Sequence, residues 1–180
     1  MIEIRPIQWS DGKLWLLDQT LLPQEEVTLE LNRCQQAIDA IHDMQVRGAP
    51  AIGVTAGYAM AMAAREISAK SADEYMSQLE DAASRIAAAR PTAVNLFWAV
   101  ERMIGLAKSD PDPQSMPDRL LAEASVIAGA DGGVLNVTVI DEPQMTSLFI
   151  KYDIENETVI AGTQGVAPDD TWVPFIPARN

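Results

Sequence analysis

Two short segments place an arginine at a helix-breaking dipeptide, directly before a stretch that predicts a new helix. One segment contains Arg47, Gly48, Ala49 and Gly53, and the other begins with an Arg-Pro pair at Arg90. A helix N-terminus presents unpaired N–H groups and the positive end of the helix dipole, so an adjacent arginine creates a binding position for phosphate. Two such positions together predict a small phosphorylated ligand.

Simpler interpretations exist for the same residues. Arginines near helix ends also pair with carboxylates, and the chain has 26 acidic residues. Gly48 and Gly53 also fit the roles of packing or capping glycines. The single cysteine, Cys34, is expected to be a small core residue, and His42 a solvated one. No pair of His, Cys or carboxylate residues has metal-ligand spacing, so no metal site is expected.

Composition narrows the class of partner. The 180 residues carry a formal net charge of -13, which repels nucleic acid and anionic membranes and leaves neither as an expected partner. One cysteine fits a reducing cytosol, and the N-terminus lacks the layout of a signal peptide. The longest apolar run, 52–64, is too short to span a bilayer. We therefore expect a cytoplasmic protein.

The elements that position these segments follow from local patterns. An Asp-Gly turn signal at Asp11 separates two runs rich in β-favouring residues, which predicts an N-terminal hairpin. From Thr28 the period changes to that of a helix, which ends at Gly48 and Pro50. Residues 52–69 are apolar on nearly every side and rich in small side chains, as in a buried central helix.

Further helices follow. Ser71 and Glu74 form a capping box that opens one helix, and the Arg-Pro pair at Arg90 closes it. Another helix starts near Thr92, and a third follows Ser115. The helices are expected to bury a common core of Ile38, Ile41, Ile52, Met60, Leu79, Ile86, Leu96, Val100 and Met103.

The character of the chain changes after Gly129. Three short strands are predicted at 134–140, 147–154 and 158–161. The predicted fold is α+β, with a hairpin or small sheet on a helical bundle and a small β-rich C-terminal appendage. The predicted domains are residues 1–128 and 129–180.

Three segments, in this order and with helices between them, resemble the N-terminal domain of the methylthioribose-1-phosphate isomerase family. They are 19–23, 44–53 and 90–96, and the resemblance covers about residues 2–127. That family is related to the regulatory α, β and δ subunits of the translation factor eIF2B. The resemblance implies that Arg47, Gly48, Ala49 and Arg90 bind a phosphorylated sugar, without a cofactor. It also implies an aldose–ketose isomerisation in methionine salvage.

The resemblance assigns no catalytic residue. The family's acid–base pair, a cysteine and an aspartate, lies in a larger C-terminal domain with no counterpart here in length, and Cys34 does not match that cysteine. A chimera, a truncated product with a new tail and a remote divergent member all fit residues 129–180. Two hypotheses follow: the substrate-gripping part of an isomerase with little or no activity alone, or a non-catalytic structural or interaction module. Whether copies form a homo-oligomer is left open.

Overall fold

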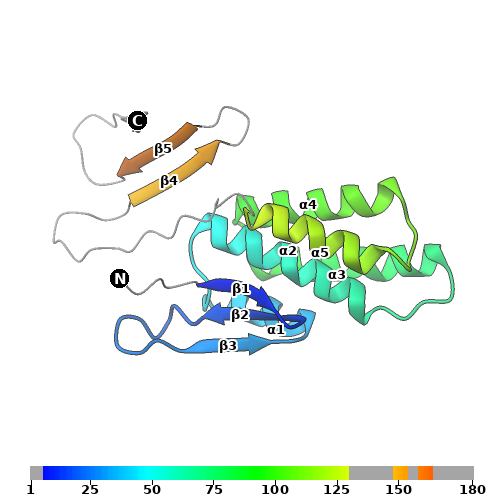
Figure 1. Cartoon of the computed structure of the whole chain (residues 1–180), viewed down its shortest axis with the longest axis horizontal. Coiled ribbons are helices and arrows are strands. Elements are labelled where there is room, and N and C mark those ends of the chain that lie inside the picture. The colour runs from blue at the N-terminus through cyan, green and yellow to red at the C-terminus, as the bar shows by residue number, and fades with distance from the viewer. Residues whose placement is uncertain (1–5, 130–147, 154–157, 164–180) are drawn as a thin grey trace. The chain divides into compact units, whose positions relative to one another are not determined.

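The computed structural model describes residues 6–129, 148–153 and 158–163, and the chain divides into two units, Met1–Val134 and Leu135–Asn180. In the described part of the first unit, three antiparallel strands form one layer beside five helices (Figure 1). The predicted α+β fold is confirmed. The elements of this unit are β1 (Ile7–Ser10), β2 (Lys13–Leu17), β3 (Thr28–Leu31), α1 (Cys34–His42), α2 (Ala49–Glu66), α3 (Ala72–Ala89), α4 (Val94–Ser109) and α5 (Met116–Ile127).

The N-terminal hairpin forms where the Asp-Gly pair predicts it. Strands β1 and β2 are joined by Asp11 and Gly12, whose φ angles of 54° and 76° are both left-handed. Two consecutive left-handed residues match the right-handed twist of the strands on either side. The turn therefore fixes the register that pairs Ile7 with Leu16.

The prediction that a helix begins at Thr28 is wrong for its first residues, because residues 28–31 form the third strand. Strand β3 pairs with β2 so that Leu31 faces Leu14 and Leu29 faces Leu16. The alternation of exposed Thr28 with leucines turned toward the core is that of a half-buried strand. Helix α1 begins only at Cys34.

Helix α2 is the central helix of the first unit. Of its 18 residues 14 are buried, and it contacts α1, α3, α4 and α5. The expected burial is confirmed, although the helix begins at Ala49 and ends at Glu66, earlier than predicted at both ends. Every residue of the predicted core is 7% exposed or less. The predicted cap of α3 also forms, since the Ser71 hydroxyl accepts the N–H of Glu74 at 3.1 Å.

In the second unit, β4 (Leu148–Asp153) pairs with β5 (Thr158–Thr163) in an antiparallel, two-stranded sheet. These strands correspond to the ones predicted at 147–154 and 158–161. The strand predicted at 134–140 lies outside the described residues, and the domain boundary between residues 128 and 129 stays a prediction.

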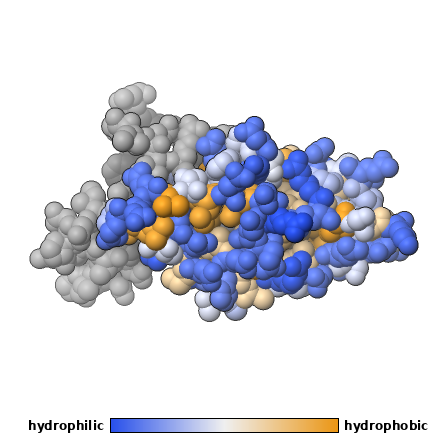
Figure 2. All heavy atoms as spheres, turned by 90° about the horizontal axis from the view of Figure 1, so that it is seen from below, coloured by the Kyte–Doolittle hydropathy of each residue, from blue (hydrophilic) through white to orange (hydrophobic). Residues whose placement is uncertain are grey.

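The described face seen in Figure 2 is mainly hydrophilic, with a smaller group of hydrophobic side chains interrupting it. None of the described helices combines the length and the apolar character that a membrane span requires. The large hydrophobic side chains exposed in the described part of the chain are Leu21, Leu22, Met44, Val94, Trp98 and Val126.

Candidate functional site

The loop that carries Arg47 is shaped by a left-handed residue at the end of α1. Met44 has a φ of 60°, and the next residue, Gln45, donates its N–H back to the carbonyl of Ala40 at 3.0 Å. This is the reversal that commonly closes a helix C-terminus. The carbonyl of Met44 then accepts the Arg47 Nε at 3.2 Å. The loop backbone thus holds the inner end of the Arg47 guanidinium.

A buried carboxylate fixes the same loop from the other side. Asp18, 5% exposed, accepts the backbone N–H of Thr20 at 2.9 Å, the Thr20 hydroxyl at 2.6 Å and the Gln45 Nε2 at 2.8 Å. Burial alone would raise the pKa of the Asp18 carboxyl. The hydrogen bonds from Thr20 and Gln45 and the charge of Arg47 outweigh it, so the pKa lies below its usual value. Asp18 therefore stays ionised and holds Gln45, two residues before Arg47.

Helix α2 begins directly after Arg47 without a side-chain cap. Gly48 occupies the N-cap position with a φ of 89°, and the helical bonds begin with the N–H of Ile52 donating to its carbonyl at 3.0 Å. The first turn contains Pro50 and no acidic residue. The N–H of Ala49 precedes the first helical donor and points out of the helix end, where it is available to an anion.

Arg90 precedes helix α4 by a short turn, three residues before its N-cap residue Ala93. It ends α3, and its carbonyl accepts the N–H of Ala93 at 3.0 Å in a tight turn. Helix α4 starts at Val94, with Ala93 as an N-cap residue that offers no side-chain acceptor, and no acidic residue lies in its first turn. The two predicted arginines therefore precede two helix N-termini that lack capping side chains.

Both helix ends open into one pocket of about 400 Å³, called here the two-arginine pocket. All four residues predicted to bind a phosphorylated sugar line it. Arg90 is half-buried and Arg47 exposed, and neither forms an ion pair with a carboxylate in the described part of the chain. The lining residues are Met44, Arg47, Gly48, Ala49, Ile52, Arg90, Thr92, Ala93 and Val94.

The chemistry of this lining suits an anion. It offers two guanidinium groups, backbone N–H groups and the Thr92 hydroxyl, with apolar surface from Met44 and Val94. Among the described residues, the lining includes no carboxylate, imidazole or thiol. Such a pocket can bind a phosphate and position its substituent, but its own side chains offer no group suited to accept a proton from carbon at neutral pH.

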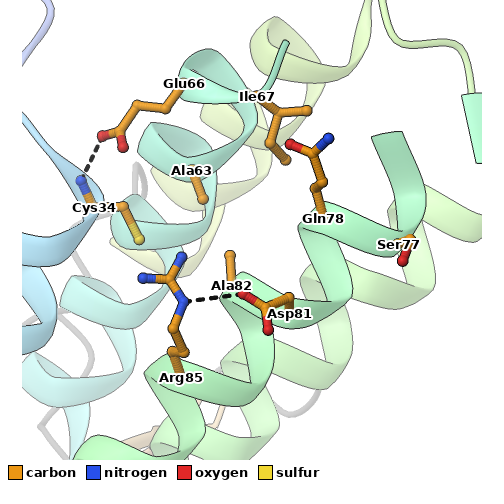
Figure 3. Close-up of a pocket in the computed structure, with 9 residues that line it drawn as sticks. All are labelled: Cys34, Ala63, Glu66, Ile67, Ser77, Gln78, Asp81, Ala82 and Arg85. Carbon is orange, nitrogen blue, oxygen red and sulfur yellow. Dashed lines mark hydrogen bonds and ion pairs between the residues drawn. The ribbon is translucent and has the colours of Figure 1, made fainter. Parts of the chain in front are cut away.

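A second pocket, of about 340 Å³, lies between α2 and α3 beside the start of α1 (Figure 3). Several of its polar groups are engaged in hydrogen bonds: the Glu66 carboxylate accepts the backbone N–H of Cys34 at 2.6 Å, and Arg85 donates to Asp81 at 3.2 Å and to the neighbouring Gln35 at 3.1 Å. Burial, helped by Glu66 and opposed by Arg85, raises the pKa of the Cys34 thiol to about 12. Cys34 is thus an unreactive core residue, as predicted.

The side chains that bind metals are dispersed in the described part of the chain, where no three of His, Cys, Asp and Glu gather. His42 is exposed, as predicted, and its Nδ1 lies 2.8 Å from the carboxylate of its neighbour Asp43. Sequence reasoning did not find the contributions of Asp18, Met44 and Val94. Asp18 is distinguished by its burial, Met44 by its backbone conformation and Val94 by its position in the pocket lining. The amino-acid sequence by itself shows none of these three properties.

Comparison with known proteins bears on the same region. Residues 45–139, more than half of the chain, match the model of the initiation factor 2 subunit family. The chain belongs to this family. Both Arg47 and Arg90 lie within the matched residues. The family resemblance found in the sequence is therefore confirmed.

Several relatives of this family member carry enzyme names. It is 46% identical over 132 residues to a methylthioribose-1-phosphate isomerase of Geotalea uraniireducens, an alignment that covers 72% of this chain and 38% of the relative. It is 44% identical over 131 residues to a 5-deoxyribose 1-phosphate isomerase of Bacillus anthracis, with the same shares covered. The chain thus spans under two fifths of the length of these relatives.

Solved structures give the same result for the fold of this family member. The 5-methylthioribose 1-phosphate isomerase of Pyrococcus horikoshii matches with a TM-score of 0.66 and 33% identity, over 69% of this chain and 35% of that one. Subunit delta of the translation initiation factor eIF-2B from A. fulgidus matches with a TM-score of 0.66 and 39% identity, over 72% and 38%. The shared region therefore occurs in proteins named as enzymes and in one named as a translation factor.

Proposed function

We propose that the two-arginine pocket holds the phosphate and sugar oxygens of an aldose 1-phosphate, as the substrate-binding part of an aldose–ketose isomerase in methionine salvage. The observation that carries the proposal is the convergence of two arginines and two helix N-termini on one pocket. The names of the relatives, which specify sugar 1-phosphates, support this class of ligand.

Electrostatics favour this pocket as the anion site of an acidic protein. The net charge of -13 disfavours an anion over most of the surface, so binding requires locally concentrated positive groups. A guanidinium forms charge-assisted, often bidentate hydrogen bonds with phosphate, worth about 1.5–3 kcal/mol each. Arg47 and Arg90 supply this charge, and the N–H groups at the start of α2 add donors.

The apolar part of the lining suits the other end of such a sugar. Both sugars named in the relatives lack a hydroxyl group at carbon 5, where one carries a methylthio group and the other carries hydrogen. Met44, Ile52 and Val94 line the pocket beside the arginines and expose only hydrocarbon and thioether atoms. We assign these three side chains to the apolar end of the sugar.

Binding and turnover are separate parts of the proposal. Isomerisation moves a hydrogen between carbons 1 and 2, which requires a group that accepts and returns a proton. Arginine stays protonated in proteins, and threonine is a weak base. We therefore expect the 180-residue chain alone to bind the sugar phosphate with little or no turnover.

Titration calorimetry with methylthioribose 1-phosphate tests the binding. Arg90→Gln should weaken the affinity at least 10-fold, because it removes about 1.5–3 kcal/mol of charge-assisted bonding. Arg85→Gln is the matched control: it also removes one charge from the last turns of α3 but lies at the other pocket. Equal affinity for both variants would refute the site. An NMR assay that detects rapid conversion to the ketose by the chain alone would refute the second part.

The alternative is a non-catalytic interaction module, favoured by the likeness to subunit delta of a translation initiation factor. On that hypothesis the pocket is a remnant, and the chain acts by binding other protein surfaces. It predicts that wild-type chain and Arg90→Gln bind the sugar phosphate equally poorly. It also predicts association of copies, which sedimentation velocity measures.

A further inference from the structure

Helices α2 and α4 pack closely against each other at Gly53, one turn into α2. A Cβ atom placed on Gly53 would lie 3.0 Å from the carbonyl oxygen of Asn95 and 3.4 Å from its Cβ. Ordinary van der Waals contacts of a Cβ atom lie at 3.4–4 Å. The absence of a side chain at Gly53 is thus what permits the present spacing of the two helices.

The contact lies where it sets the width of the pocket. Gly53 is one helical turn beyond Ala49, and Asn95 is the second residue of α4, next to Val94. Ala49 and Val94 both line the two-arginine pocket, from opposite helices. Because the nearest atoms of Asn95 include backbone atoms, a side chain at Gly53 would move the first turn of α4 as a whole.

We infer that Gly53 is a positioning residue for phosphate binding, which it serves by keeping the N-terminus of α4, and with it Arg90, within reach of the anion held at the N-terminus of α2. This inference rests on the proposed function. An added methyl group would shift the start of α4 outward by a few tenths of an ångström, the difference between the 3.0 Å approach and an ordinary contact. Hydrogen bonds to a single phosphate from both sides tolerate little of such a shift.

The same helix provides a matched control one turn further on. At Gly57 an added Cβ would lie 3.3 Å from the Cδ1 of Ile127, which is the far end of a side chain on α5. That atom can rotate away without moving a helix, and Gly57 does not line the pocket. Both substitutions replace glycine by alanine inside one helix, so the intrinsic preference of helices for alanine is the same in both.

The test compares the wild type, Gly53→Ala, Gly57→Ala and Arg90→Gln as the full 180-residue chain. Calorimetry with methylthioribose 1-phosphate and with inorganic phosphate gives the affinities, and thermal unfolding gives the stability. We expect Gly53→Ala to lower the affinity for both ligands at least 10-fold. Its melting temperature should stay within a few degrees of that of Gly57→Ala. Affinity of Gly53→Ala equal to the wild type, with Arg90→Gln impaired, would overturn the inference and leave the proposed function standing.

A measurement without ligand distinguishes failure of the proposed function from failure of the positioning role of Gly53. If the wild type binds neither ligand, the proposed function fails, and crystal structures of the wild type and Gly53→Ala then decide the geometric claim. The distance between the Cα atoms of Gly48 and Ala93 should increase by a few tenths of an ångström in the variant. An unchanged distance would overturn the positioning role whether or not the ligand binds.

Discussion

Replacing Asp18 by alanine is the most informative perturbation of the loop that carries Arg47. The variant removes the acceptor for three donors, two on Thr20 and one on Gln45. Thr20 is exposed, so water replaces part of what its donors lose, at about 0.5 kcal/mol each. Gln45 is half-buried, and its amide loses about 1 kcal/mol. The free energy of unfolding should therefore fall by about 2 kcal/mol.

Urea denaturation followed by circular dichroism measures this loss. The control is Asp39→Ala, because Asp39 is an exposed carboxylate that accepts one bond from Gln35 on the same helix. That change should cost less than about 0.5 kcal/mol. A loss below about 1 kcal/mol for Asp18→Ala would refute the view that this carboxylate anchors the loop.

The same variant carries a pH signature. The folded-state pKa of Asp18 lies below its unfolded value, so its ionised form stabilises the fold above the unfolded pKa of about 4. That stabilisation is lost as the pH falls through the lower, folded-state pKa. The stability difference between wild type and Asp18→Ala should thus be constant near neutrality and narrow below about pH 4. A difference that widens in acid would contradict the assignment.

Three further outcomes are expected elsewhere in the first unit. The Cys34 thiol, with its pKa raised to about 12, should resist a disulfide reagent at pH 8 until the protein unfolds; rapid labelling of the native chain, followed by absorbance, would contradict its burial. Gly48→Ala should cost about 1–3 kcal/mol in urea denaturation, because a φ of 89° with a ψ of 133° is strained for a residue with a side chain, although the space around it is open; an unchanged stability would contradict this backbone geometry. Ser71→Ala should cost about 1 kcal/mol through the lost cap of α3, whereas Ser71→Asp should retain most of the stability.

The features predictable from the sequence are those encoded by neighbouring residues. The Asp-Gly pair at Asp11 determines a left-handed turn by itself, and the small apolar residues of α2 leave it no stable environment except the core. Arg47 and Arg90 were identifiable because each stands next to a helix-breaking residue. Strand β3 was not predicted, because it has only four residues. An alternating pattern with two inward leucines over so short a segment cannot be distinguished from the first turn of the helix that follows.

The supporting parts of the candidate site depend on residues far apart in the chain. Asp18 is one of 26 acidic residues, and only its burial and its hydrogen bonds with Thr20 and Gln45 distinguish it from a solvated carboxylate. The sequence is compatible with Gly53 as a packing glycine or as a capping glycine, and its close contact with Asn95 on α4 is seen only in the folded chain. Such contacts are products of the assembled fold, which local periodicity does not contain.

The composition of α2 limits how the family member can change. Its small side chains allow neighbouring helices to approach closely, so added volume at one position displaces an atom on another helix. At Gly57 the displaced atom belongs to Ile127, and a larger residue there is compatible with a smaller residue in α5. Positions on α2 are therefore expected to vary in compensating pairs with their partners, whereas the outer faces of α3 and α4 can vary one residue at a time.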